Sequence, residues 1–432
     1  MGLFYSFSVL IIIATVFAYI NARFLKLPST IGIMVIAIIF SLALVVVGRI
    51  SPEPLAELHH LLDDVDFTQL LMGGMLYFLL FAGAIQININ DLKEQKLSII
   101  VFSTLSVVLS TFVVGFGLYY ALSFLLPLVG IHIQLSLLYC LLFGALISPT
   151  DPIAVLSILK EAKVSKALEA KVTGESLFND GMAVIAFTLI YNLAQGTEQL
   201  SDITFLSISW LLVKEIAGGI LVGLGLGYLG FHAMIRTGDY KLSVLITLSV
   251  VIGGYIISQA MGISGPLTMV SAGLVIGNAN RKYSEIKHIE NNFLRTFWEL
   301  TDEILNAVLF LLIGFEILLI PTLKNYWLAG LISILIVLIA RYISIKIPTL
   351  VIPFKEKFSK TTFFVLVWGG LRGGVSIALA LSITDLAFRD AIVSITYFVV
   401  VFSIVVQGLS IGRIAKRLQC EDCSSKRSTP IG

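Results

Sequence analysis

Charged residues are scarce in this chain. Asp, Glu, Lys and Arg together make up 13% of its 432 residues, against about 25% in an average soluble domain. Hydrophobic residues make up 57% of the sequence, and the mean hydropathy is +0.98. A soluble core does not need apolar residues at this density. The composition therefore excludes an ordinary soluble domain and predicts a polytopic membrane protein.

Cysteine is scarce as well, which excludes a disulfide framework. Cys140 lies inside an apolar segment, while Cys420 and Cys423 form a CxxC pair in the polar tail. We interpret that pair as two free thiols, because an isolated CxxC is weak evidence for a redox or zinc site. No spacing of His or Cys indicates a metal ligand set, and we expect no cofactor.

The N-terminus lacks a basic stretch and a small-residue cleavage site, so its first apolar segment is predicted to be a retained span. Windows of about 20 apolar residues predict an all-α protein with about 13 transmembrane helices. Their ranges are 3–21, 31–48, 67–87, 97–126, 135–159, 168–195, 205–231, 241–260, 264–279, 296–320, 326–348, 362–386 and 388–412.

Lys and Arg gather in alternate connections between these spans, beginning with the first, and in the C-terminal tail. Most of the 29 basic residues belong to this set, whereas the other connections hold only Arg49, Lys324 and Arg389. Basic connections of membrane proteins face the cytoplasm. We therefore expect the N-terminus outside and the C-terminus in the cytoplasm.

Two prolines interrupt the fifth span, which reads LLFGALISPTDPIAVLSIL. Pro149 and Pro152 each remove a backbone donor and clash with the preceding turn. Asp151 before Pro152 is typical of an N-cap followed by proline at the first helical position. The sequence thus predicts two half-helices that meet at Thr150 and Asp151. Such a break is tolerated at membrane depth only where protein or a hydrated cavity satisfies the freed backbone groups.

The twelfth span, FFVLVWGGLRGGVSIALALS, contains a second interruption. Glycine permits irregular backbone and close helix contact. Four glycines surround Arg372 there: Gly369, Gly370, Gly373 and Gly374. An ordinary kink is the alternative for each span, but a buried guanidinium is costly and needs a partner.

Interruptions at matching places in two halves indicate a transporter built from inverted repeats, with the binding site at the breaks. Spans one to six and eight to thirteen would be the repeats, and span seven would join them. This expectation rests on hydropathy and on the positions of the breaks, since the halves share no clear sequence identity.

The sixth span carries polar residues without an interruption. At about 100° per residue they fall within about 140° of the helix surface, so they must face protein or water instead of lipid. These residues are Glu175, Ser176, Asn179 and Asp180. Carboxylates there must be paired, protonated or bound to a cation. A polar network that only holds helices together is the alternative.

Arg372 is a permanently charged partner for one of the two carboxylates. Asp180 lies deeper along the helix than Glu175, so we assign Glu175 to Arg372 and leave Asp180 to bind a proton or a hard cation. Hard cations prefer oxygen ligands, which Ser176, Thr150 and the freed carbonyls of the fifth span can supply. Proton and cation would then compete for one site.

Three motifs give the chain a resemblance to a known family: SPTDPIAV (148–155), GESLFNDGMAV (174–184) and GGLRGGVSIALAL (369–381). Together with VVQGLS (405–410), they resemble the NhaP/NHE branch of monovalent cation/proton antiporters, over nearly the whole chain. The resemblance implies secondary active exchange of Na⁺ for H⁺, with Li⁺ as an alternative cation. Such exchange is not an enzymatic reaction.

The resemblance also implies roles for individual residues. Asp180 would carry the ion and the proton, Ser176 and Thr150 would ligate Na⁺, and Asp151 would assist through the hydrated break. Asn179 occupies the position where the electrogenic branch has a second aspartate, which predicts electroneutral exchange. Glu175 and Arg372 match the family's supporting ion pair.

The same resemblance implies a homodimer in a prokaryotic cell membrane, with elevator-like alternating access. Residues 1–96 and 197–325 would form the dimerisation domain and its linker span, residues 97–196 and 326–412 the two halves of the core, and 413–432 a short cytoplasmic tail. One position departs from the family, because LLFAGA (79–84) places Ala82 where many relatives have a glutamate.

Two alternatives remain at this point. One is a potassium/proton antiporter on the same scaffold. The other, an intramembrane aspartyl protease, needs two aspartates and usually a GxGD motif, which this sequence lacks. We expect Asp302 and Glu303, with Glu299, to be a solvated helix end, although a pH-sensing cluster is conceivable from the same pattern.

Overall fold

The computed structural model describes residues 3–48, 58, 62, 67–152, 155–156, 166–196, 205–237, 239–287, 293–320, 322–354, 358–415 and 417. This part of the chain consists of helices, turns and connecting loops, without a strand, so the predicted all-α class is confirmed. The tail cysteines Cys420 and Cys423 lie outside the described residues.

The helices of the first half come in this order: α1 (Leu3–Ile20), η1 (Asn21–Leu25), α2 (Ser29–Val47), α4 (Phe67–Leu70), η2 (Leu71–Met75), α5 (Leu76–Gln86), α6 (Ile89–Glu94), α7 (Lys96–Ser103), α8 (Leu105–Tyr120), η3 (Ala121–Leu125), η4 (Pro127–Val129), α9 (Leu137–Ile147) and α11 (Lys166–Ala194). The second half supplies α12 (Phe205–Thr237), α13 (Tyr240–Met261), α14 (Gly265–Lys287), α15 (Phe293–Leu319), η5 (Leu323–Asn325), α16 (Trp327–Val351), α17 (Lys360–Trp368), α18 (Gly374–Leu381), α19 (Leu386–Phe402) and η6 (Ser403–Gln407).

Nine helical segments within the described residues are long and apolar enough to cross a membrane. The other four predicted spans do not appear as single long apolar helices, and each has a physical reason. The fifth and twelfth are interrupted, so they appear as the short helices α9, α17 and α18. The ninth and tenth lie on α14 and α15, which are long helices with several charged and amide side chains.

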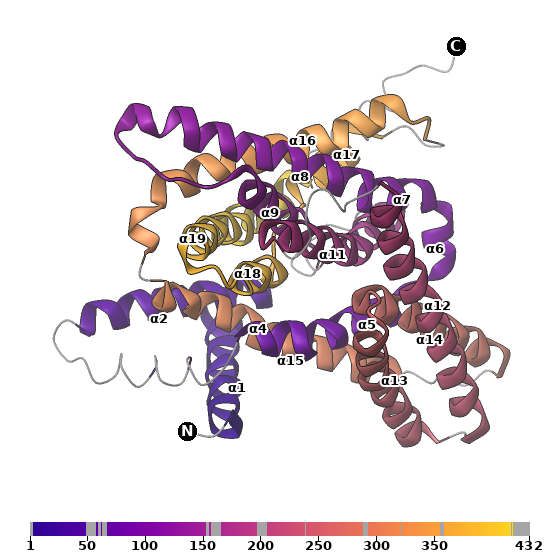
Figure 1. Cartoon of the computed structure of the whole chain (residues 1–432). Helices are drawn as coiled ribbons and strands as arrows, with labels where there is room; N and C mark the ends of the chain where they lie inside the picture. The colour runs from indigo at the N-terminus through magenta and orange to yellow at the C-terminus, as the bar shows by residue number, and fades with distance from the viewer. Residues whose placement is uncertain are drawn as a thin grey trace, which may run out of the picture.

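The helices form two neighbouring groups (Figure 1), and the described residues include two buried apolar clusters. α9, α11, α18 and α19 lie at the centre of the view, with α8 and α16 along one side of them. α12, α13 and α14 lie together on another side, where α14 packs against both α5 and α12. α15 packs against α2 and α5 and also contacts α18, so it connects the two groups.

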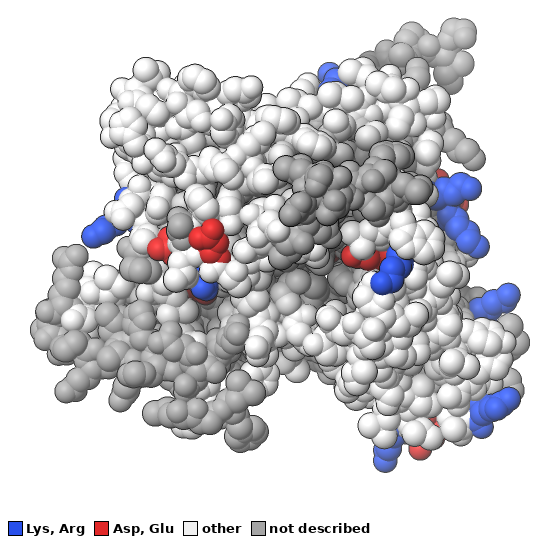
Figure 2. Space-filling view, in the orientation of Figure 1, with Lys and Arg blue, Asp and Glu red and all other residues white. Residues whose placement is uncertain are grey.

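The surface carries little charge over broad areas (Figure 2). Most Lys and Arg side chains on the visible face lie near its edges, and large white areas separate them. Long apolar side chains are exposed on several helices, including Tyr19, Phe40 and Leu221. Such a surface suits a hydrocarbon environment, because lipid places no penalty on exposed apolar side chains.

Candidate functional site

The two interrupted segments meet at their breaks, as the sequence predicts. α9 ends at Ile147, and α17 and α18 flank the irregular residues 369–373. The backbone amide of Asp151 donates to the carbonyl of Leu371 over 2.7 Å, which joins one break to the other. The amide of Leu156 donates to the carbonyl of Pro152, a bond between residues four apart as in an α-helix. Asp151 directly precedes this bond, at the position where the sequence predicts an N-cap.

Arg372 satisfies backbone groups that the proline break leaves without helical partners. Its Nη1 donates to the carbonyls of Ser148 and Pro149 at the end of α9. Its own amide donates to Ser403 Oγ over 2.9 Å. The guanidinium is 1% exposed, and the negative end of the α9 dipole stabilises its charge.

The predicted pair between Glu175 and Arg372 is wrong. Glu175 Oε1 lies 2.6 Å from Nη1 of Arg341 on α16, with both side chains buried. Arg341 also donates from Nε and Nη2 to the carbonyl of Leu366, over 3.0 and 2.8 Å. Gly370 leaves the space that this arrangement needs, since a Cβ there would lie 2.7 Å from Arg341 Nε.

The sequence pattern does not single out Arg341, because a basic residue near the end of a span resembles one in a connection. Its position nevertheless falls inside the predicted span 326–348, and α16 buries it to 6% exposure. An arginine within a predicted span needs a partner. That signal was available for Arg341 as well as for Arg372, and it would have offered two candidates for Glu175.

The polar face of α11 packs against the first break through direct hydrogen bonds. Thr150 Oγ1 lies 3.0 Å from Ser176 Oγ. Asn179 donates from Nδ2 to the same Thr150 hydroxyl over 2.8 Å, and its Oδ1 accepts weakly from the Thr150 amide at 3.4 Å. All three residues are nearly inaccessible. Asn179 is therefore positioned to orient the threonine hydroxyl.

Asp180 and Asp151 lie together beside these hydroxyls, close enough for their negative charges to interact. Asp151 also faces the start of α18, because a Cβ on Gly373 would lie 2.6 Å from Asp151 Oδ2. The N-terminus of α18 at Gly374 therefore stabilises the charge of Asp151. Asp180 has no comparable half-helix start in its own unbroken helix.

A pocket of about 680 Å³ reaches this group of residues. Asp180, Asp151, Thr150, Ser176 and Pro152 all line it. Its wall also contains charged residues from the three helices α6, α11 and α15: Asp91, Lys166, Glu169, Arg295, Glu299, Asp302 and Glu303. Carboxylates outnumber basic groups along this wall, so the pocket attracts cations. The predicted solvated helix end at Glu299, Asp302 and Glu303 is thus part of the pocket wall.

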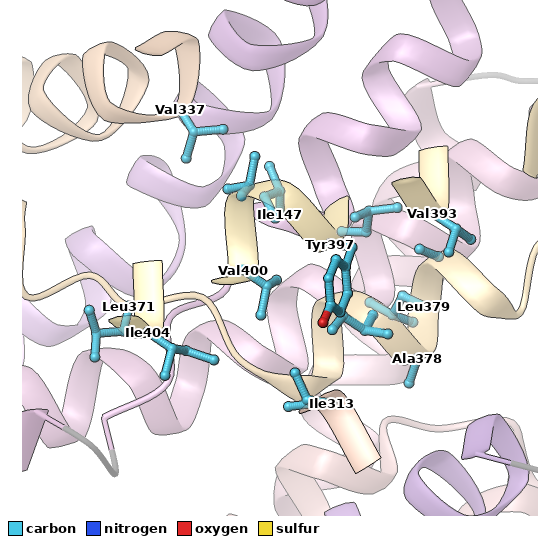
Figure 3. Packing of buried hydrophobic residues seen from close by; sticks show 14 of the residues in the cluster. Ile147, Ile313, Val337, Leu371, Ala378, Leu379, Val393, Tyr397, Val400 and Ile404 are labelled. Carbon is cyan, nitrogen blue, oxygen red and sulfur yellow. The ribbon is translucent and has the colours of Figure 1, made fainter. Parts of the chain in front are cut away.

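Apolar packing closes the far side of the pocket. The α15 residues that line it end at Leu309. One turn further, Ile313 is fully buried in a cluster with residues of α9, α18 and α19 (Figure 3). Tyr397 and Val400 of α19 lie in the same cluster. The site is therefore open toward one end of the helices and closed toward the other.

The sequence matches the family described as "Sodium/hydrogen exchanger, transmembrane" over residues 11–417. It is 42% identical to the Na⁺/H⁺ antiporter NhaP of Pseudomonas aeruginosa, over 94% of this chain and 95% of that protein. It is 31% identical to the Na⁺/H⁺ antiporter NhaH of Halobacillus dabanensis, over 92% of this chain and 93% of that protein.

The fold is similar to a solved structure of the sodium proton antiporter MjNhaP1 from Methanocaldococcus jannaschii at pH 8. The TM-score is 0.74 at 20% sequence identity, and the match covers 97% of this chain and 99% of that chain. At this identity the likeness shows the shared fold.

Proposed function

This chain belongs to the sodium/hydrogen exchanger family, a family of membrane transporters, and from its buried polar site we propose that it exchanges Na⁺ for H⁺. The observation that carries the proposal is the position of Asp180. Its carboxylate lines a pocket of negative charge, next to the hydroxyl groups of Thr150 and Ser176. The names of the two bacterial relatives support sodium as the cation.

Asp180 is the group that binds either ion. A dehydrated Na⁺ needs several oxygen ligands, and the Asp180 carboxylate can combine with the hydroxyls of Thr150 and Ser176 to supply them. When the cation leaves, the half-buried carboxylate keeps its charge without a counter-ion at the bottom of the pocket, and protonation removes that cost. Proton and Na⁺ therefore exclude each other, which couples their movements in opposite directions.

Exchange requires that the site opens to each side in turn. The core halves 97–196 and 326–412 would move as a unit against 1–96 and 197–325, which would form the dimerisation domain and the linker span. The hydrogen bond between Asp151 and Leu371 supports joint movement of the two broken segments. The pocket that ends at the apolar cluster of Ile313 supports a state open to one side.

We place the protein in a prokaryotic cell membrane as a homodimer, with its N-terminus outside. The pocket is lined by the beginnings of α11 and α15 and by residues next to α6, which adjoin the basic connections. By the distribution of Lys and Arg, the described state is then open to the cytoplasm.

Reconstituted protein tests the exchange directly. Proteoliposomes with an acidic interior and a fluorescent pH probe should lose their proton gradient when Na⁺ is added outside. K⁺ at the same concentration, with the membrane potential clamped, should have a smaller effect. A gradient that K⁺ dissipates and Na⁺ does not would replace the sodium proposal by potassium/proton exchange.

We expect the exchange to be electroneutral, with one proton for each monovalent cation. Glu175 is neutralised by Arg341, Asn179 cannot titrate, and the N-terminus of α18 stabilises the negative charge of Asp151. Only Asp180 is left to change its proton occupancy. A potential of 100 mV acts on each net transported charge with about 2.3 kcal/mol, so a net charge would make the rate depend strongly on potential.

Potassium–valinomycin diffusion potentials of either sign supply the measurement. Sodium-driven proton flux at matched pH should be the same at both signs. Acceleration at one sign and slowing at the other would contradict a 1:1 exchange, and it would indicate that Asp151 also carries a proton.

A further inference from the structure

α15 turns one polar face toward the pocket. The pocket-lining residues of this helix are Arg295, Glu299, Asp302, Glu303, Asn306 and Leu309. Their spacing of three and four residues places them on adjacent turns of one side of the helix. This face lines the same pocket as Asp180, so it lies within reach of a cation that enters the pocket.

Asn306 is the unusual member of this face. Its Nδ2 donates to two oxygens of Asp302, the backbone carbonyl at 2.8 Å and the carboxylate Oδ1 at 3.0 Å. These two bonds fix the orientation of the amide, because only its nitrogen can donate. Its Oδ1 is buried and has no hydrogen-bond partner in the part of the chain that the structure describes. The side chain is 1% exposed, so this acceptor remains costly unless a ligand meets it.

The neighbouring wall offers no charge to a cation. The pocket-lining residues of α5 are Leu76, Leu79, Leu80, Gly83 and Gln86, and none of them is ionisable. Ala82 is fully buried in a separate apolar cluster with Phe81 and Trp298. On this side of the pocket, α15 is therefore the source of negative charge.

The carboxylates of α15 differ in what surrounds them. Glu299 forms an exposed ion pair with Arg295 at 2.7 Å. Glu303 is exposed to solvent, whereas Asp302 is only partly exposed and holds the amide of Asn306. Asp302 and Asn306 thus bring one negative charge and one unmatched amide oxygen to the same place.

We propose that Asp302 and Asn306 form a second monovalent cation site, through which Na⁺ passes before it reaches Asp180. Carboxylate and amide oxygens are ligands of hard cations, and one carboxylate matches the charge of one monovalent ion. The unmatched Asn306 Oδ1 has a partner when the cation is bound. The proposal depends on the sodium exchange proposed above, and it adds a residue pair that concentrates the substrate at the pocket wall.

The apparent KM for Na⁺ tests this site. Asp302→Asn should raise the KM about tenfold, which corresponds to a loss of about 1.4 kcal/mol of binding, while the maximal rate at saturating Na⁺ stays near that of the wild type. Asp302→Glu should recover most of the affinity. Asn306→Leu removes the amide oxygen without changing charge, and it should raise the KM several-fold in the same assay.

Glu303→Gln is the matched control, since it removes the same charge from the adjacent position on the same wall. Glu303→Gln should change the KM for Na⁺ less than twofold. The rise in KM caused by Asp302→Asn should persist when choline chloride raises the ionic strength, because salt screens distant charges more than it weakens direct ligation. The second site would be overturned if Asp302→Asn and Glu303→Gln raised the KM for Na⁺ equally and if both increases disappeared at high ionic strength. The two residues would then act only through the overall negative potential of the pocket.

The wild-type protein in the same vesicles separates the two proposals. If it drives no sodium-dependent proton flux, the proposed exchange fails. If it exchanges normally and the Asp302 and Asn306 variants keep its KM, only the second site fails. Detergent melting of each variant shows whether it remains folded.

Discussion

Asp180→Asn is expected to abolish sodium-driven proton movement and to leave the protein folded. The asparagine amide has nearly the same size and keeps one oxygen, but it can neither lose a proton nor neutralise a cation. The hydrogen bonds among Thr150, Ser176 and Asn179 do not involve the Asp180 side chain, so the packing of α11 against the break should persist. Removing a half-buried acidic group also removes a cost of desolvation, which favours an unchanged or higher melting temperature.

The control is Asp390→Asn, the same chemical change at an exposed position of α19 that does not line the pocket. Both variants and the wild type should be reconstituted at equal density, with empty vesicles as the baseline. Asp390→Asn should match the wild type, and Asp180→Asn should match the empty vesicles. Sodium-dependent proton flux by Asp180→Asn well above that baseline would sink the assignment of Asp180 as the carrier.

The breaks could be predicted from the sequence because their causes are local. Pro149 and Pro152 cannot continue an α-helix, whatever packs around them. The glycines around Arg372 likewise permit irregular backbone on their own. The polar face of α11 follows from helical periodicity alone. The structure confirms the breaks near residues 148–152 and 369–373, and it places Thr150 against Ser176 and Asn179.

Contacts between distant helices could not be predicted in the same way. Hydropathy fixes where a helix crosses the bilayer, but not which helix lies beside it or how each is rotated. Arg341 and Arg372 were both possible partners for Glu175, and only the packing of α16 against the core selects Arg341. The mistaken choice also had a specific cause, because a basic residue near the end of a span looks like part of a connection.

The wall of the pocket could not be predicted for a related reason. Glu299, Asp302 and Glu303 have the pattern of a solvated helix end, and that pattern says nothing of which neighbour they face. The structure places them in the wall of the pocket that Asp151 and Asp180 also line, together with Asn306. A local sequence pattern therefore predicts the polarity of a helix face. The function of that face depends on the element that packs beside it.

The ion pair between Glu175 and Arg341 leads to the largest expected loss of stability. Arg341→Ala leaves the carboxylate of Glu175 buried without a countercharge and the carbonyl of Leu366 without its donor. Removing one partner of a buried pair costs about 3–5 kcal/mol. Glu175→Gln should be destabilising as well, because Arg341 then keeps a buried charge with only a neutral acceptor.

The double variant distinguishes a true pair from two independent losses. If each residue mainly compensates the charge of the other, Arg341→Ala combined with Glu175→Gln should destabilise by less than the sum of the single variants, with a coupling of about 1–3 kcal/mol. Lys324→Ala, at an exposed position of η5, removes a positive charge without breaking a buried contact and should melt like the wild type. Melting in one detergent at one pH supplies the comparison, and strict additivity of the two single effects would argue against the pair.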